Sequence, residues 1–257
     1  LWLAAVDGGA GPAGPPALLR SGGAGGASPF DAAGVLRFGL TADYPPFAAR
    51  TADGRLIGAD VEAARRVARA LGREAHFVPT TWASLAADFA AGRFDVLVGG
   101  ITVTPERAAL GRYSITLLED GKRPLVRCDD RERLATPAQL DRPQVRVMIN
   151  RGPGMPAVAQ RLFPRARLVV NREDATLVPF LLEGRVDAWV TDGVVVDHMA
   201  RRHAGVLCAA RSGPWPATEV RKAWLVRADP GLADAIDVAL RDELASGRWR
   251  RDLEAVP

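Results

Sequence analysis

A threonine hydroxyl and an arginine guanidinium stand five residues apart in the stretch DVLVGGITVTPER, residues 95–107. Thr102 and Arg107 can hold a carboxylate together, because a guanidinium donates two parallel hydrogen bonds and a hydroxyl can add a third. Gly99 and Gly100, just before them, let the backbone come close to a ligand and are expected to leave bare amide N–H groups. The stretch predicts a carboxylate site; the alternative is an ordinary strand, turn and helix with a surface arginine.

The residues around this candidate site have the pattern of a strand that leads into a helix. Residues 95–98 form a short, mostly apolar run that stops at two glycines, which is typical of a buried parallel strand. Pro105 and Glu106 suit the first turn of a helix, where a missing N–H costs nothing and an acid meets the positive helix end. Because open α/β sheets bind ligands beyond the carboxyl ends of their strands, other strand ends should supply the rest of the site.

Further candidates follow predicted strands in the first part of the chain. The strands are predicted at residues 35–40 and 76–79, and the candidate side chains that follow them are Asp43, Tyr44, Phe47 and Trp82. Pro45 and Pro46 cannot extend the first strand because proline lacks the N–H that the ladder needs, so the chain opens into a rigid loop. Aromatic side chains at such positions can line a ligand site or pack a turn onto the core, and both interpretations stay open.

One lysine is also a candidate. The 34 lysines and arginines include only two lysines, Lys122 and Lys222. Lys122 follows Asp120 and Gly121 in a predicted turn and breaks the preference for arginine, so we include it among the candidate ligand-binding residues. A solvated surface turn is the alternative.

The second half of the chain alternates strands with helices of about ten residues, which predicts parallel pairing through right-handed crossovers. The strands predicted at residues 145–150 and 186–192 end at Asn150 and Asp192, and Arg151 follows the first of them. These polar side chains are candidates for ligand binding. Asp192 could instead cap the helix that follows it.

The order of these elements predicts an α/β fold of two lobes with a cleft between them. A chain of 257 residues that is 48% hydrophobic and 25% charged can form two small globular domains. After the second unit, a predicted strand at residues 222–227 and two helices return the chain to the first unit. We expect one lobe from residues 34–126 plus 217–257, a second from 127–216, and two hinge crossings between them.

Composition narrows the classes of partner. A net charge of +4 arises from arginines scattered among acids, so no nucleic-acid partner is expected, and no stretch is apolar enough to span a membrane. Residues 1–33 are rich in Ala, Gly and Pro and are expected to form a flexible leader. Their first six residues resemble the apolar end of a signal peptide, which suggests export.

The two cysteines, Cys128 and Cys208, each end an apolar run. They could form a disulfide in an oxidising compartment or remain two buried thiols. No metal-ligand spacing is present, and no cofactor is expected.

Taken together, these motifs resemble the extracytoplasmic solute-binding proteins of the amino-acid-binding family, family 3, over nearly all of residues 34–254. The motifs, in order, are DYPPF, PTTW, GGITVTPER, DGK, VTD and KAWLV. The resemblance implies a two-lobed type II periplasmic-binding fold. It also implies that Gly100, Thr102 and Arg107 hold an α-carboxylate, that Asp192 holds an α-amino group, and that Tyr44 and Trp82 flank the ligand side chain.

Within the family, the motifs look most like the branch of periplasmic cyclohexadienyl (arogenate/prephenate) dehydratases. Such chemistry needs an acid that protonates the departing hydroxyl. The resemblance implies a glutamate three residues after the aspartate of TDG, and this position holds Val195. The turn after Asn150 also departs from the branch, because its hydroxyl is missing; Arg151 could replace that hydroxyl as a carboxylate ligand.

Two functions follow as hypotheses. The first is capture of a small carboxylate, an amino acid or aromatic acid, for an ABC transporter permease or a sensor outside the cytoplasm. The second is a dehydratase in which Asp43, Asp192 or Glu219 replaces the missing glutamate. A degenerate homologue with a structural or sensory role is a third.

Overall fold

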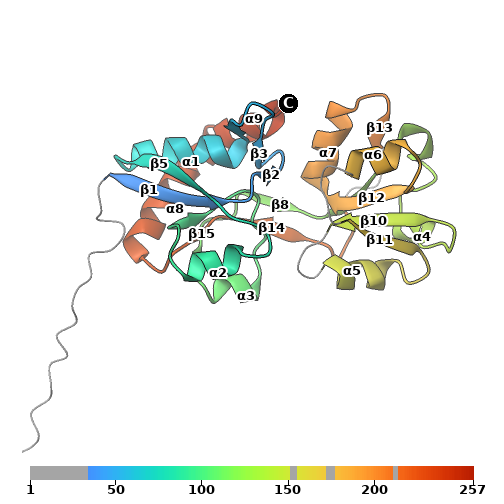
Figure 1. Cartoon of the computed structure of the whole chain (residues 1–257), viewed down its shortest axis with the longest axis horizontal. Helices are drawn as coiled ribbons and strands as arrows, with labels where there is room; N and C mark the ends of the chain where they lie inside the picture. Colours follow the sequence, from blue (N-terminus) through green and yellow to red (C-terminus); the bar gives the residue numbers. More distant parts are fainter. Residues whose placement is uncertain (1–33, 151–154, 172–176, 211–213) are drawn as a thin grey trace, which may run out of the picture.

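The computed structural model describes residues 34–150, 155–171, 177–210 and 214–257. These residues form two α/β lobes, each built on a five-stranded sheet (Figure 1). The predicted two-lobed α/β fold is confirmed. The leader predicted at residues 1–33 lies outside the described residues, as does Arg151.

The first lobe contains a mixed sheet in the order β5-β1-β6-β15-β7. The strands β5, β1 and β6 are parallel, whereas β15 runs antiparallel to both of its neighbours. The strands are β1 (Val35–Leu40), β5 (Glu74–Pro79), β6 (Val96–Leu97), β7 (Arg112–Tyr113) and β15 (Leu225–Val226). A small antiparallel sheet lies beside them, made of β2 (Asp43–Tyr44), β3 (Ala48–Arg50) and β4 (Leu56–Ile57).

Helices cover the two faces of this first sheet (Figure 1). Three of them pack against one another on one side: α1 (Ala59–Ala70), α8 (Pro230–Ala245) and α9 (Arg248–Ala255). Two short helices lie on the other side: α2 (Leu85–Ala90) and α3 (Pro105–Ala108). The apolar stripe of α1, including Val61, Ala64 and Val67, is fully buried because its helical spacing places these side chains on the face that meets the sheet.

The second lobe contains a sheet in the order β11-β10-β12-β9-β13. The strands β10, β11 and β12 are parallel, as the alternating pattern predicts, and β9 is antiparallel to β12 and β13. The strands are β9 (Lys122–Arg127), β10 (Arg146–Asn150), β11 (Arg167–Asn171), β12 (Ala188–Asp192) and β13 (Leu207–Ala209). The helices are η1 (Cys128–Asp130), α4 (Pro137–Leu140), α5 (Met155–Leu162), α6 (Leu177–Leu182) and α7 (Gly193–Arg202).

The two cysteines form a disulfide. Cys128 follows β9, Cys208 lies on the neighbouring strand β13, and the S–S distance is 2.07 Å across 80 residues of sequence. Of the two possibilities that the sequence leaves open, the structure therefore shows the pair.

Two segments pass between the lobes (Figure 1). They are β8 (Leu118–Asp120) and β14 (Val220–Lys222), which pair antiparallel as a two-stranded sheet. The prediction of a single strand at residues 222–227 is therefore wrong. The segment forms two strands, β14 in the crossing and β15 in the first sheet, and Ala223 and Trp224 separate them.

No helix among the described residues combines the length and the apolar character needed to cross a membrane.

Candidate functional site

A cavity of about 450 Å³ lies between the lobes, at the carboxyl ends of strands from both sheets. Nine of the predicted site residues line it: Asp43, Tyr44, Trp82, Gly100, Thr102, Arg107, Lys122, Asn150 and Asp192. Other lining residues were not predicted, including Thr104, Asn171, Thr191 and Lys222. The volume is within the range of about 300–1,000 Å³ that is usual for small-molecule sites.

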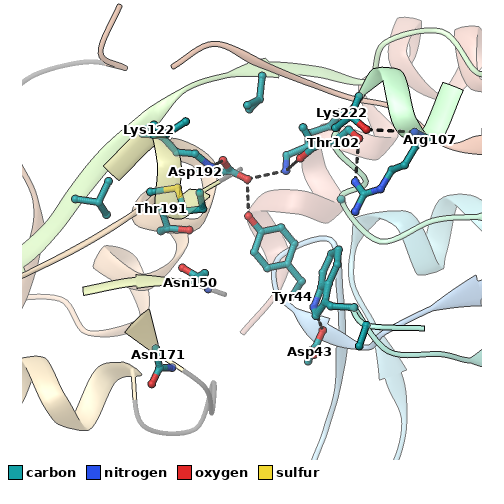
Figure 2. A pocket seen from close by; sticks show the side chains of 18 of the residues that line it. Asp43, Tyr44, Thr102, Arg107, Lys122, Asn150, Asn171, Thr191, Asp192 and Lys222 are labelled. Atoms are coloured by element: carbon teal, nitrogen blue, oxygen red, sulfur yellow. Dashed lines mark hydrogen bonds and ion pairs between the residues drawn. The ribbon is translucent and has the colours of Figure 1, made fainter. Parts of the chain in front are cut away.

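Asp192 lies at the centre of the cavity's charged groups (Figure 2). Its buried carboxylate accepts hydrogen bonds from the Tyr44 hydroxyl (2.5 Å), the Lys122 ammonium (2.5 Å) and the Lys222 ammonium (2.6 Å). Burial opposes ionisation, but the two lysines together hold the pKa of Asp192 well below its usual range. Asp192 is therefore a fixed negative charge and not a source of protons.

Strand pairing fixes the position of Asp192, and another residue caps the helix that follows it. Lys122 is its direct antiparallel neighbour on β9, so the two side chains meet across the sheet. Asp192 is the residue before α7, yet its side chain makes no cap hydrogen bond. The Asp120 carboxylate instead accepts from the N–H of Val194 (2.9 Å) in the first turn of α7. The alternative that Asp192 only caps this helix is therefore wrong.

Lys222 is a site residue that the sequence reasoning missed. It ends β14, is 3% exposed, and donates to the Thr102 hydroxyl (2.8 Å) as well as to Asp192. Its ammonium also lies 5.3 Å from the centre of the Tyr44 ring. Burial lowers the pKa of Lys222, while Asp192 acts to raise it. The rarity of lysine in the sequence could have identified Lys222 as a candidate, because both lysines of the chain line this cavity.

Arg107 brings a second positive charge to the wall formed by the first lobe. The Thr104 side chain caps α3 by accepting from the N–H of Arg107, which places the arginine in the last turn of that helix. Its guanidinium donates to the Thr102 carbonyl (3.0 Å), and the residue is only 9% exposed. Burial lowers the pKa of Arg107. Within the described ranges, no carboxylate forms an ion pair with it.

The two glycine amides predicted to be bare are already engaged. The buried Asp60 carboxylate accepts from the N–H of Gly99 (2.8 Å) and of Gly100 (2.9 Å), and also from the Trp249 indole (2.9 Å). The prediction that these amides are free for a ligand is therefore wrong. Gly100 still lines the cavity.

Glycine is required at position 100 for two reasons. Its φ of 74° is rarely adopted by other residues, and a Cβ there would lie 2.5 Å from the Phe47 ring and 2.9 Å from the Tyr44 ring. The backbone thus comes close to aromatic side chains of the protein itself, which explains the glycine without any ligand.

Aromatic side chains form one wall. Tyr44 and Trp82 meet edge to face with ring centres 5.7 Å apart, and the Trp82 indole donates to Asp43 (3.0 Å). Phe47 is fully buried and stacks on Tyr44 at 5.6 Å. It does not line the cavity, so it supports Tyr44 from behind, and its predicted contact with a ligand stays a prediction. Burial and the nearby Asp192 raise the pKa of Tyr44 well above its usual range.

On the second lobe, Asn150 faces the cavity from the end of β10. Its side-chain oxygen accepts from the Trp189 indole (2.6 Å), which leaves its NH₂ group as the available donor. Val195, the position where the enzyme branch implies a glutamate, is 1% exposed and belongs to an apolar cluster that includes Trp189. It lines a second cavity of about 500 Å³ together with Tyr44 and Asn150, not the cavity that contains Asp192.

The described residues contain no group of three or more His, Cys, Asp or Glu side chains that could hold a metal ion.

Solved structures resemble this fold closely. A binding component of an ABC transporter from Wolinella succinogenes, in complex with lysine, shares 27% identity with a TM-score of 0.77, covering 86% of this chain and 94% of that one. A reconstructed ancestral cationic amino acid solute-binding protein shares 28% identity with a TM-score of 0.76 over the same fractions. A second structure of that ancestral protein is described as a precursor of cyclohexadienyl dehydratase.

Sequence comparisons agree. Cyclohexadienyl dehydratase of Pseudomonas aeruginosa is 34% identical over 221 residues, which are 86% of this chain and 82% of that enzyme. The L-cystine-binding protein of Escherichia coli K12 is 30% identical over 159 residues, 62% of this chain and 59% of that protein. Residues 36–254 match the sequence pattern of a single family. Sequence and fold agree that the chain belongs to the bacterial extracellular solute-binding proteins, family 3.

Proposed function

We propose that this chain captures a small carboxylate, an amino acid or an aromatic acid, in the cleft between its lobes. The observation that carries the proposal is Arg107: a buried guanidinium on the cavity wall with no carboxylate partner among the described residues. Burying a charge is costly unless an opposite charge compensates it. A ligand carboxylate that reaches Arg107 and the Thr102 hydroxyl supplies that compensation.

The other walls suit the rest of such a ligand. Tyr44 and Trp82 offer aromatic faces to an apolar or aromatic body, while Lys122 and Asn150 offer donors from the opposite lobe. A ligand that contacts both lobes favours their closure about the crossings β8 and β14.

The partners follow from the family. Proteins of this kind that the chain resembles include binding components of ABC transporters. We infer that this chain works outside the cytoplasm, in the periplasm, and delivers its ligand to a transporter permease or a sensor.

A thermal-shift screen tests the capture of carboxylates. Amino acids, aromatic oxo acids, prephenate and L-arogenate are added in turn to the purified chain. A ligand at a hundred times its dissociation constant adds about 2.7 kcal/mol to the free energy of unfolding, which is a readily measured shift. If none of these acids raises the melting temperature, the proposal fails.

A dehydratase is the second candidate, and the 34% identity to cyclohexadienyl dehydratase favours it. The site argues against it. The position implied for the acid holds the buried Val195, and Asp192 is held ionised between two lysines. Neither can protonate a leaving hydroxyl. Of the other two acids considered, Glu219 does not line the cavity, and Asp43 lines it but is exposed.

Incubation with prephenate and L-arogenate separates the candidates. We expect binding without formation of phenylpyruvate or phenylalanine; turnover by the wild-type chain would favour the enzyme instead. The variant Val195→Glu probes the scaffold, and Val170→Glu, at a valine that is 45% exposed, is its matched control. Activity that appears only in Val195→Glu would identify a dehydratase scaffold that lacks its acid.

A further inference from the structure

Asp192 already has ammonium partners from the chain itself. The resemblance to amino-acid-binding proteins implies that this carboxylate holds the α-amino group of a ligand. Here Lys122, Lys222 and Tyr44 all donate to it, at 2.5–2.6 Å. A carboxylate offers about four lone-pair directions, so three donors occupy most of its capacity.

We propose that Lys222 takes the place of a ligand ammonium at Asp192, so that the cleft prefers small acids without an α-amino group over the matching α-amino acids. This inference rests on the proposed capture of a carboxylate. It concerns the second polar group of the ligand, whereas the proposed function concerns the carboxylate that Arg107 binds.

Lys222 is held in place by several contacts. Besides Asp192, its ammonium donates to the Thr102 hydroxyl (2.8 Å) and lies 5.3 Å and 5.7 Å from the ring centres of Tyr44 and Phe47. Both carboxylate and lysine are almost fully buried, 2% and 3% exposed. If Lys222 swung away to admit another ammonium, a buried positive charge would lose its counter-ion, which is strongly unfavourable. The backbone of Lys222 is also fixed, because it pairs with both β8 and Thr102.

The charged residues that line the cavity also disfavour a ligand ammonium group. Among the described residues that line the cavity, three carry positive charge (Arg107, Lys122 and Lys222) and two carry negative charge (Asp43 and Asp192). Asp43 is exposed and accepts from the Trp82 indole. An incoming ammonium beside Asp192 would stand next to two lysine ammonium groups, and like charges at such distances repel.

The chemistry of the preferred ligand follows. One carboxylate of the ligand binds Arg107. A second oxygen of the ligand, at least two bonds from the carboxylate carbon, accepts a hydrogen bond from Lys122. The Lys122 ammonium has three N–H donors and uses one of them on Asp192. A 2-oxo group, a 2-hydroxyl group or a second carboxylate can supply this oxygen. An α-ammonium group cannot, because it has no lone pair to offer.

Calorimetric titration with matched pairs tests the inference. The pairs are phenylpyruvate with L-phenylalanine, and 2-oxoglutarate with L-glutamate; the members of each pair differ only at the α-carbon. For the wild-type chain, we expect the oxo acid of at least one pair to bind ten times more tightly than its amino acid.

Two variants sharpen the test. Lys222→Met removes the ammonium but keeps the length of the side chain, and should reverse the preference toward the amino acid. Arg221→Met alters the neighbouring residue of β14, which is exposed and does not line the cavity, and should leave the preference unchanged. Circular dichroism checks that both variants fold.

The outcomes separate the two proposals. Equal or tighter binding of the amino acid in both pairs by the wild-type chain overturns the role of Lys222 and leaves carboxylate capture intact. The same holds if Lys222→Met folds and keeps the wild-type preference. If neither these four acids nor any acid of the thermal-shift screen binds, carboxylate capture itself fails and the role of Lys222 fails with it. If Lys222→Met does not fold, the comparison within the wild-type chain still decides.

Discussion

The buried charged residues of the cleft differ in the group that compensates each charge. Arg107 is buried beside the Thr102 carbonyl, which partly offsets its desolvation, and Lys222 is buried against Asp192. No described carboxylate pairs with Arg107, so we infer that a ligand supplies one, whereas the carboxylate that pairs with Lys222 belongs to the chain.

Replacement of Arg107 tests whether a ligand carboxylate binds this guanidinium. We expect Arg107→Met to weaken binding of the tightest acid found in the thermal-shift screen by about 100-fold, because hydrogen bonds to charged groups contribute about 1.5–3 kcal/mol each. Arg250→Met, at an exposed arginine, is the control and should bind as the wild type does. Calorimetry measures both. Unchanged affinity in Arg107→Met would place the carboxylate elsewhere.

A buried histidine outside the cleft gives a pH-dependent prediction. His198 is 1% exposed, and its Nε2 has no hydrogen-bond partner in the described part of the chain. Burial first, and then the positive Arg201 and Arg202, lower the pKa of His198 to about 4, from 6.5 in the unfolded chain. Between pH 6.5 and pH 4 the unfolded state binds more protons, so the stability that neutral His198 contributes is lost as pH falls.

Over that window the wild type should lose up to about 3 kcal/mol more stability than His198→Gln. The control is His76→Gln, at an exposed histidine. Urea unfolding at pH 7, 5.5 and 4 measures the difference. Parallel pH profiles for the wild type and His198→Gln would show that His198 does not titrate as described.

The sequence identified much of the cleft at this scale, but not Lys222. Tyr44, Trp82 and Asp192 were candidates because each lies at or beyond the carboxyl end of a predicted strand. Open α/β sheets bind their ligands at this edge. Lys222 lies in a crossing segment, and its contact with Asp192 depends on how two lobes meet, which no local pattern encodes.

At the scale of elements, α1 and α9 support the strand end on which the site is built. Asp60, in the first turn of α1, fixes the glycine amides after β6, and Trp249 of α9 holds the same carboxylate. The glycines themselves were visible in the sequence. Their partner lies 39 residues earlier in the chain, so the sequence pattern could not distinguish a carboxylate of the protein from that of a ligand.

Asp60→Asn should therefore destabilise the first lobe. The amide can offer its oxygen to the glycine N–H groups or to the indole, but its NH₂ group then faces another donor. We expect a loss of about 2–3 kcal/mol in the free energy of unfolding, as for a buried donor left unsatisfied. Asp53→Asn, at an exposed acid, is the control. Equal stability of Asp60→Asn and the wild type, by denaturant unfolding, would contradict this account.

The disulfide joins two neighbouring elements of the second lobe. It closes a loop of 80 residues, so chain entropy predicts that its removal costs about 4.5 kcal/mol. We expect the double variant Cys128→Ala, Cys208→Ala to show this loss in denaturant unfolding. Added reductant should destabilise the wild type and leave the double variant unchanged, because the chain has no other cysteine. A wild type insensitive to reductant at its unfolding midpoint would oppose the prediction.

At the scale of the whole molecule, the site depends on contacts between lobes. Tyr44 of the first lobe, Lys222 of a crossing and Lys122 of the second lobe all meet at Asp192. The two-lobed architecture was predictable because strands and helices alternate in two runs and the chain returns to the first. The strand β9 (Lys122–Arg127) belongs to the second sheet, so the sheets divide before the predicted boundary at residues 126/127. The boundary at residues 216/217 stays a prediction.

We infer that the cleft recognises its ligand by a carboxylate. Calorimetric titration of the wild-type chain with the tightest-binding acid of the screen, and with the primary amide of that acid, tests it most directly. The two ligands have nearly the same shape and differ in the charge that Arg107 would bind. We predict that the amide binds at least 100-fold more weakly than the acid. Equal affinity for the two, or no binding of any acid, would contradict the account.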